Sequence, residues 1–281
     1  MTWRFDAIGT RWEIETDQPL SSQLQGRVTA TVERFDREWS RFRADSVVSS
    51  LRRGGTVDAP PDAGVMLDGY RELSRVTDGA VNPLIGLGLE ALGYDAAMSL
   101  QSGRPESAPA DWESILTWTP TTLTMHRPGV IDVGALGKGR LVDLVAAELR
   151  DLPGRTIIDA SGDLLVRGGA ALVALEHPYD PTSAIGVVEV AGRALCASAV
   201  NRRVWGDGLH HVLDARTGVP VRTWAATWAI ADDAIRADAV ATALFFDGGP
   251  GLAGAWGVDW VRMTTDGRVE RSAAFAGELF T

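Results

Sequence analysis

Two stretches, Trp224-Ala-Ala-Thr-Trp-Ala-Ile-Ala231 and Ala237-Asp-Ala-Val-Ala-Thr-Ala-Leu-Phe-Phe246, decide the fold class. The first is a short apolar run that predicts a buried β-strand, and the second is longer and predicts an apolar helix. From Trp112 onward, further short strand candidates follow one another, and only one other clear helix interrupts them. Such an order favours an α+β fold with largely antiparallel sheets and packed helices over alternating βαβ units.

The other strand candidates after Trp112 share short length and apolar or β-branched composition: 115–119, 122–125, 156–158, 164–166, 172–175, 185–190, 195–198 and 260–263. The second helix is expected over 139–150. Before Trp112, we expect a strand over 10–16, a helix entered near Ser21 or Ser22 and running to Trp39, and another helix carrying Met66 to Val76. Residues 54–64, 78–94 and 101–111 are rich in glycine or proline and predict loops or irregular structure.

Composition limits the class of protein. The chain has 281 residues, a net charge of -10 and a pI near 4.9, and it contains no block of basic residues, which argues against a nucleic-acid partner. Its single cysteine, Cys196, excludes an internal disulfide, and a buried small hydrophobe is the first interpretation for it, with a nucleophile as the alternative. No apolar run is long enough for a transmembrane segment, and the N-terminus resembles neither a signal peptide nor a lipobox. We therefore expect a cytoplasmic protein, with an extracytoplasmic one left open.

Asp238 and Thr242 lie four residues apart in the predicted helix 237–246. Positions i and i+4 share one face of a helix, so this pair offers a carboxylate and a hydroxyl oxygen to one cation. Hard oxygen ligands suit Mg²⁺ or Ca²⁺ better than zinc. The neighbours of the pair are Ala, Val and Leu, so we expect Asp238 to be buried and to need a partner. A charge on a helix face without a ligand is the alternative.

Two glycine-containing turns could approach a ligand. Asp132-Val-Gly-Ala-Leu-Gly-Lys-Gly139 leads into the helix 139–150, and its backbone N–H groups and Lys138 could hold an anion. The spacing is not that of a Walker loop, and a tight strand-to-helix turn is the alternative. In Asp159-Ala-Ser-Gly-Asp163, two carboxylates flank a small-residue turn that could be a ligand loop or only a turn.

Two further clusters are polar. His211 precedes an Asp, an Arg and a Thr-Gly turn in residues 211–218, where an imidazole could deprotonate a hydroxyl nucleophile or could be structural. Arg41-Phe-Arg43 places an aromatic ring between two cations, a combination that suits an aromatic heterocycle bearing phosphate. The alternative for this segment is a solvated helix end with one core Phe.

Taken together and in this order, these segments resemble the ApbE family of flavin transferases, which move FMN from FAD onto a Ser or Thr of a target protein. The resemblance covers residues 2 to 248. The segments that carry it are Ile8-Gly-Thr10, Ser40-Arg-Phe42 with Asp45-Ser46, Asp132 through Asp143, Ser161-Gly-Asp163, His211 through Gly218, and Ala237 through Thr242.

The resemblance implies a role for each matched position and a single domain, residues 1–281, with two lobes and a flavin cleft. Asp238 and Thr242, with a backbone carbonyl of the Gly134-Ala135 turn assigned to Ala135, would ligate Mg²⁺. His211 would be the base for the hydroxyl of the acceptor protein, and AMP would leave. The FAD-binding positions would be Lys138, Ser161, Gly162, Asp163, Ser198, Asn201 and Arg202.

Several positions depart from the family pattern. Its Phe-Asp-Pro-Thr is Val81-Asn-Pro-Leu84 here, and its Thr-Ser-Gly is Ala197-Ser-Ala199. An expected Asn is Arg52, and the Pro before the Arg-Thr-Gly turn is Ala215. These changes affect expected flavin and adenine contacts but spare the metal and base positions. Two alternatives to the transferase therefore stay open, an FAD pyrophosphatase that gives FMN and AMP, and a flavin-binding protein without turnover.

Overall fold

The structure is a computed structural model that describes residues 1–206 and 208–280. The chain divides into two compact units. Unit 1 comprises Met1–Val32, Leu136–Asn201 and Arg222–Thr281, and unit 2 comprises Glu33–Ala135 and Arg202–Val221. Strands and helices are mixed in both, and every strand pairing is antiparallel among the described residues, which confirms the α+β prediction. The single domain with a flavin cleft stays a prediction.

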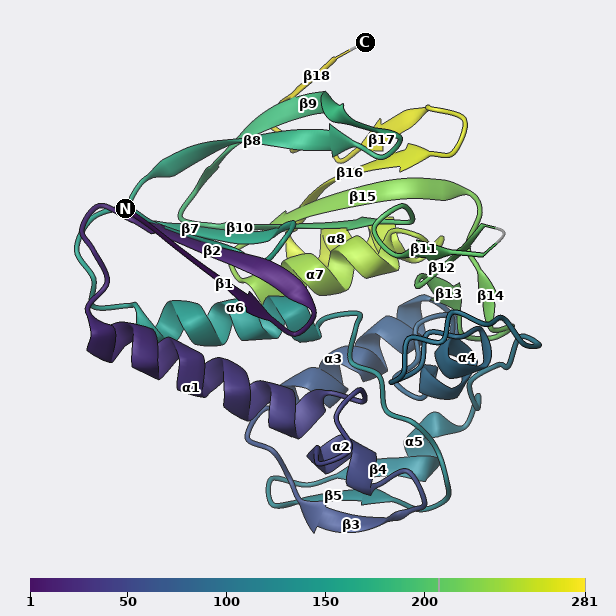
Figure 1. The fold of residues 1–281 in the computed structure, drawn as a ribbon. Helices are drawn as coiled ribbons and strands as arrows, with labels where there is room; N and C mark the ends of the chain where they lie inside the picture. The colour runs from purple at the N-terminus through teal and green to yellow at the C-terminus, as the bar shows by residue number, and fades with distance from the viewer. Residues whose placement is uncertain (207, 281) are drawn as a thin grey trace. The chain divides into compact units, whose positions relative to one another are not determined.

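Unit 1 is built on an eight-stranded sheet in the order β1-β2-β6-β7-β10-β15-β16-β17 (Figure 1). A second sheet of three strands has the order β18-β9-β8. The strands of the large sheet are β1 (Thr2–Ala7), β2 (Thr10–Thr16), β6 (Thr156–Asp159), β7 (Asp163–Arg167), β10 (Ala194–Ala199), β15 (Trp224–Ala231), β16 (Asp259–Thr264) and β17 (Val269–Arg271). Those of the small sheet are β8 (Ala170–His177), β9 (Asp180–Ala191) and β18 (Glu278–Leu279).

The large sheet is covered on both faces. Apolar side chains of β7, β10, β15 and β16 meet those of β8 and β9 in one core cluster. On the other face lie α6 (Gly137–Glu148) and α7 (Ala234–Ala243), with α8 (Gly249–Trp256) beside α7 (Figure 1). Because β15 is covered on both sides, all eight of its residues are buried, as the continuous apolar run predicts.

Thr227 is the polar exception in β15. Its side chain is fully buried on the α7 side, and its hydroxyl donates to the Ala241 carbonyl at 2.6 Å. We expect Thr227→Val to lower the free energy of unfolding by about 1–3 kcal/mol, because the Ala241 carbonyl would lose a buried donor. Urea denaturation measures the change, with the exposed Thr2→Val as its control. Equal stability of the two variants would contradict this role.

Unit 2 combines short helices with short strands. Its one three-stranded sheet among the described residues has the order β3-β5-β4. The helices are α2 (Val47–Ser50), α3 (Ala63–Val76), α4 (Gly86–Ala91) and α5 (Trp112–Ile115), while α1 (Ser22–Trp39) begins in unit 1 and ends in unit 2. The strands are β3 (Gly55–Asp58), β4 (Leu116–Trp118), β5 (Thr122–Met125), β11 (Val204–Trp205), β12 (Leu209–His210), β13 (Leu213–Asp214) and β14 (Val219–Pro220).

The structure corrects several expected boundaries. The helix expected over 237–246 begins three residues earlier, because Asp233 caps it by accepting a hydrogen bond from Arg236 N. The helix expected over 139–150 is Gly137–Glu148. Two stretches expected to be loops contain short elements, β3 within 54–64 and α4 within 78–94. Among the described residues, no helix has both the length and the apolar character needed to cross a membrane.

Candidate active site

Helix α7 carries the first predicted site residues, Asp238 and Thr242, one turn apart on the same helix face. Asp238 is 3 % exposed, as its small apolar neighbours predict, and Thr242 is partly exposed. Among the described residues, Gly139 is the hydrogen-bond donor to Asp238, with its N–H 2.8 Å from Oδ2. This leaves Oδ1 as the oxygen that Asp238 can offer to a ligand.

The contact between Asp238 and Gly139 depends on close approach of α6 to α7. A Cβ at position 139 would lie 2.2 Å from the Ala234 carbonyl oxygen and 2.7 Å from the Asp238 Cβ. Glycine therefore lets the first turn of α6 lie against the middle of α7. In a regular α-helix, the N–H of residue 139 would donate to the carbonyl of residue 135. The Gly139 N–H donates to Asp238 instead of to the Ala135 carbonyl.

We expect Gly139→Ala to lower the free energy of unfolding by about 3 kcal/mol or more, because the added methyl group would overlap backbone atoms of α7. Gly254→Ala is the matched control, since a Cβ there meets no atom within 4 Å. That control replaces an exposed helical glycine and should gain about 0.5–1 kcal/mol. Urea denaturation measures both, and an unchanged stability for Gly139→Ala would show that the helices are less closely packed.

Lys138 and Asp163 form a buried ion pair beside Asp238. The Lys138 Nζ lies 3.1 Å from Asp163 Oδ2, and the side chains are 22 % and 1 % exposed. The ammonium also donates to the carbonyl of Ala160 at 3.2 Å. Because Asp163 is buried and paired with Lys138, the pair holds the lysine in one position at the start of β7, on the sheet face that α6 covers. Breaking such a pair leaves a buried charge uncompensated.

Burial and charge shift the pKa values of this group in a consistent way. Burial raises the pKa of Asp238 well above its usual value, and the nearby Asp163 carboxylate adds to the rise. Burial alone would lower the pKa of Lys138, but the charges of Asp163 and Asp238 outweigh it and raise that pKa. Two carboxylates and one ammonium thus share a poorly solvated region, and an added cation would be stabilised there.

The Ser161-Gly162 turn lies against the same group. Ser161 has a φ of 57°, in the left-handed region that few non-glycine residues adopt, and Gly162 has a φ of 104°. The Ser161 hydroxyl donates to the Arg11 carbonyl at 2.7 Å, and the Ala197 N–H donates to the Gly162 carbonyl at 2.9 Å. This second bond brings the turn beside β10, which carries Ser198.

Asn201 follows β10 in unit 1, and its side-chain amide donates to the Pro178 carbonyl at the tip of the β8–β9 hairpin. The structure thus brings Lys138, Ser161, Gly162, Asp163, Ser198 and Asp238 together in one region of unit 1. Asn201 and Thr242 belong to the same unit. The remaining predicted site residues, Ala135, Arg202 and His211, belong to unit 2.

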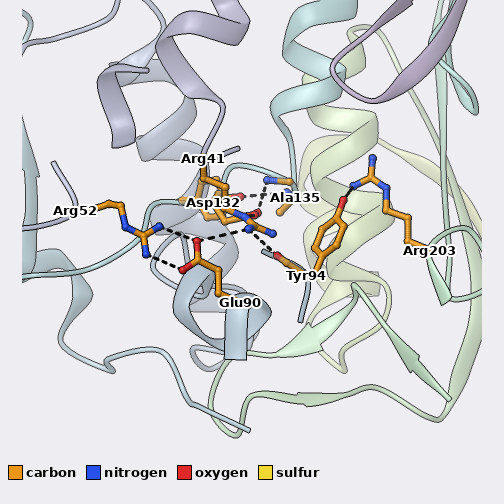
Figure 2. A network of polar contacts seen from close by, with 9 residues as sticks. Arg41, Arg52, Glu90, Tyr94, Asp132, Ala135 and Arg203 are labelled. Atoms are coloured by element: carbon orange, nitrogen blue, oxygen red, sulfur yellow. Dashed lines mark hydrogen bonds and ion pairs between the residues drawn. The ribbon is translucent and has the colours of Figure 1, made fainter. Parts of the chain in front are cut away.

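In unit 2 the Asp132–Ala135 turn is held by several hydrogen bonds. Asp132 Oδ1 accepts from Gly134 N at 2.8 Å, and Oδ2 accepts from the buried Arg41 Nε at 2.6 Å (Figure 2). The Arg41 guanidinium also donates to the Tyr94 carbonyl and lies 4.1 Å from the centre of the Phe42 ring. The cation of Arg41 is therefore compensated inside unit 2, which favours a structural role for the segment Arg41-Phe-Arg43.

Arg52 and Ala215, two positions that differ from the family pattern, form hydrogen bonds within unit 2. Arg52 forms two hydrogen bonds of 2.7 Å with the Glu90 carboxylate, and Glu90 also lies near Arg41 (Figure 2). The Ala215 N–H donates to the Ala80 carbonyl at 2.9 Å, a bond that the family's proline could not make.

Two neighbouring histidines differ in their surroundings. His210 is 6 % exposed, with Nε2 2.9 Å from the Val221 carbonyl and Nδ1 accepting from Val212 N, which is the pattern of a structural histidine. His211 is more exposed than His210, and its role as the base stays a prediction. The carboxylate of Asp214 binds Arg216 through contacts of 2.9 and 2.7 Å, so it stiffens the 214–218 turn.

The side chains of Asp238 and Thr242 are of the kind that binds Mg²⁺, since both offer oxygen ligands. Among the described residues, no three His, Cys, Asp or Glu converge on one point. A site with one carboxylate is nevertheless compatible with Mg²⁺, which keeps several waters and takes few protein ligands. Asp238, with one carboxylate oxygen not hydrogen-bonded in the described chain, fits such a site, and Thr242 on the next turn adds a hydroxyl.

Two residues that support these elements were not assigned a role from the sequence. Asp143 accepts hydrogen bonds from the N–H groups of Ala234 and Ile235 at 2.8 and 2.9 Å, and so fixes the start of α7 against α6. Burial raises the pKa of Asp143 to about 6. Tyr70 lies on the apolar face of α3, and its hydroxyl contacts the Asp132–Ala135 turn. The sequence indicated Asp143 only as the last residue of the segment 132–143, which carries part of the family resemblance.

Comparison with known proteins identifies the family. The model of the ApbE family matches residues 8–255. An FAD:protein FMN transferase of Rhodobacter capsulatus is 28 % identical over 291 residues, covering 94 % of this chain and 55 % of the relative. The chain thus spans about half the length of that relative.

Solved structures share the fold. The ApbE protein of Thermotoga maritima is similar with a TM-score of 0.84 and 21 % identity, covering 97 % of each chain. The flavinyl transferase ApbE of Pseudomonas stutzeri has a TM-score of 0.80 and 21 % identity, with coverage of 98 % of this chain and 95 % of the other. The flavin transferase ApbE of Vibrio cholerae has 0.77 and 20 %, with coverage of 98 % and 97 %. Since the family model covers most of the sequence, this chain belongs to the ApbE family.

Proposed function

We propose that this chain is a Mg²⁺-dependent transferase that moves FMN from FAD to a Ser or Thr hydroxyl of another protein and releases AMP. The observation that carries the proposal is the buried group in unit 1, where Asp238, Lys138 and Asp163 lie together. Family membership and the FAD:protein FMN transferase of Rhodobacter capsulatus support the choice of reaction.

The reaction needs compensation of charge on the FAD pyrophosphate. Lys138 would bind a phosphate oxygen, and Asp163 keeps its ammonium in place. Asp238 and Thr242 would hold Mg²⁺, with the Ala135 carbonyl as a further predicted ligand. Bound Mg²⁺ would supply Lewis-acid stabilisation of the negative charge that develops on the phosphates.

Flavin binding would fall to the residues around the Ser161-Gly162 turn. The left-handed backbone there exposes peptide groups without bulky side chains, which suits close approach of a ligand. Ser198, Asn201 and Arg202 would add contacts to FAD. These assignments follow from the resemblance, and they remain proposals for each residue.

The acceptor hydroxyl oxygen attacks the phosphorus of the FMN half, and its proton passes to the imidazole of His211. The bond between that phosphorus and the bridging oxygen breaks, and AMP leaves with the bonding electrons. The acceptor keeps FMN through a phosphoester bond.

Incubation with FAD and MgCl₂, with and without a mixture of soluble proteins, tests the proposal. Flavin fluorescence that stays on a protein band after denaturation supports transfer. Release of free FMN equal to AMP would indicate an FAD pyrophosphatase instead. Intact FAD that binds without any AMP release would indicate a flavin-binding protein.

A further inference from the structure

The Tyr70 hydroxyl bridges the two ends of the Asp132–Ala135 turn. It donates to the Asp132 carbonyl at 3.0 Å and accepts from the Ala135 N–H at 3.1 Å. The side chain is 1 % exposed on α3, so the ring cannot move aside without disturbing the core of unit 2. One hydroxyl therefore satisfies two backbone groups that lie 62 and 65 residues away in sequence.

These bonds fix successive peptide planes. Tyr70 holds the Asp132 carbonyl and the Ala135 N–H, while the Gly134 N–H is held by Asp132 Oδ1 at 2.8 Å. Because a peptide unit is planar, holding one N–H or C=O fixes the direction of the whole unit. Three consecutive peptide units are therefore fixed, and the next carbonyl along the chain belongs to Ala135.

The Ala135 carbonyl is not oriented by a helical hydrogen bond. The Gly139 N–H, its helical donor, donates to Asp238 instead. A carbonyl in this state can serve as a ligand, provided that the turn before it is rigid.

We infer that Tyr70 is a positioning residue, which orients the Asp132–Ala135 turn so that the Ala135 carbonyl can bind the cation. This inference rests on the proposed function, because it takes Ala135 as a Mg²⁺ ligand. It assigns to Tyr70 a role that goes beyond packing of α3, since the hydroxyl makes hydrogen bonds to the backbone of the turn.

Tyr70→Phe separates the two roles because it removes the hydroxyl and keeps the ring. Tyr179→Phe is the matched control, since Tyr179 is 55 % exposed in the hairpin between β8 and β9. Two measurements are made on the full chain: the dissociation constant for MgCl₂ by isothermal titration, and hydrogen exchange of the Ala135 amide in the absence of metal. FAD binding in EDTA and the unfolding free energy are recorded for each variant.

In Tyr70→Phe we expect the dissociation constant for Mg²⁺ to rise about 10- to 100-fold, as for other residues that orient metal ligands. The Ala135 amide should exchange faster than the change in global stability explains, while FAD affinity in EDTA stays unchanged. The control should match the wild type in all of these. Normal Mg²⁺ affinity in Tyr70→Phe would overturn the inference, and so would a parallel loss of Mg²⁺ and FAD affinity.

The exchange measurement keeps this inference separate from the proposed function. If the wild type binds no Mg²⁺, the metal part of the proposed function fails, and the Ala135 amide alone decides whether Tyr70 fixes the turn. Exchange at Ala135 that changes no more than global stability would then refute the positioning role.

Discussion

Asp238→Asn is expected to reduce Mg²⁺-dependent release of AMP from FAD by about 100-fold or more, because a Lewis-acid metal contributes several kcal/mol to phosphoryl transfer. Asparagine can still accept the hydrogen bond from Gly139 N through its amide oxygen, so the contact between α6 and α7 is retained. It lacks the charge that a cation needs. Turnover as a function of MgCl₂ concentration measures the effect.

Stability distinguishes loss of a ligand from loss of fold. The Asp238 carboxylate is buried, and burial raises its pKa, which means that the charged form is costly in the absence of a cation. Asp238→Asn should therefore unfold at the same or a higher urea concentration than the wild type. The control is Asp232→Asn, whose side chain is 89 % exposed in the same unit. Wild-type turnover in Asp238→Asn would remove the metal assignment.

His211→Ala is expected to slow transfer of FMN to protein by about 10²- to 10⁴-fold, the range for loss of a general base. FAD affinity should stay close to that of the wild type, because the imidazole acts on the acceptor hydroxyl. Rates come from flavin fluorescence on the acceptor band, and affinity comes from fluorescence titration with FAD.

His126→Ala is the matched control for this variant. His126 lies in unit 2, follows β5 and contacts the Thr117 hydroxyl at 2.9 Å, so its loss should not change the rate. An equal decrease of rate and FAD affinity in His211→Ala would make His211 a binding residue. His210→Ala is a poor control, because both ring nitrogens of His210 hold the backbone of its loop.

The sequence predicted elements with a strong apolar pattern and missed those without one. The run 224–231 has no competing interpretation, and its predicted bounds agree with β15. Helix α8 contains three glycines and a proline in eight residues, so its pattern does not favour a helix, and packing against α7 and β16 stabilises it instead. Strand β3 is a four-residue edge strand without apolar alternation.

The candidate site was predictable only in part. Burial of Asp238 follows from its small apolar neighbours in the helix, which are visible in the sequence. Its partner Gly139 is 99 residues away, and no local pattern indicates that α6 approaches α7 there. The same limit applies to Tyr70, whose periodic position predicted a core residue, while the partners of its hydroxyl depend on the tertiary fold.

The ratio of AMP to free FMN produced from FAD tests the central claim most directly. Wild-type protein is incubated with FAD, MgCl₂ and a mixture of soluble proteins, and both products are quantified chromatographically alongside protein-bound flavin. We expect AMP to exceed free FMN, with the difference recovered as flavin covalently bound to protein. Equal amounts of AMP and free FMN, or no AMP at all, would contradict the account.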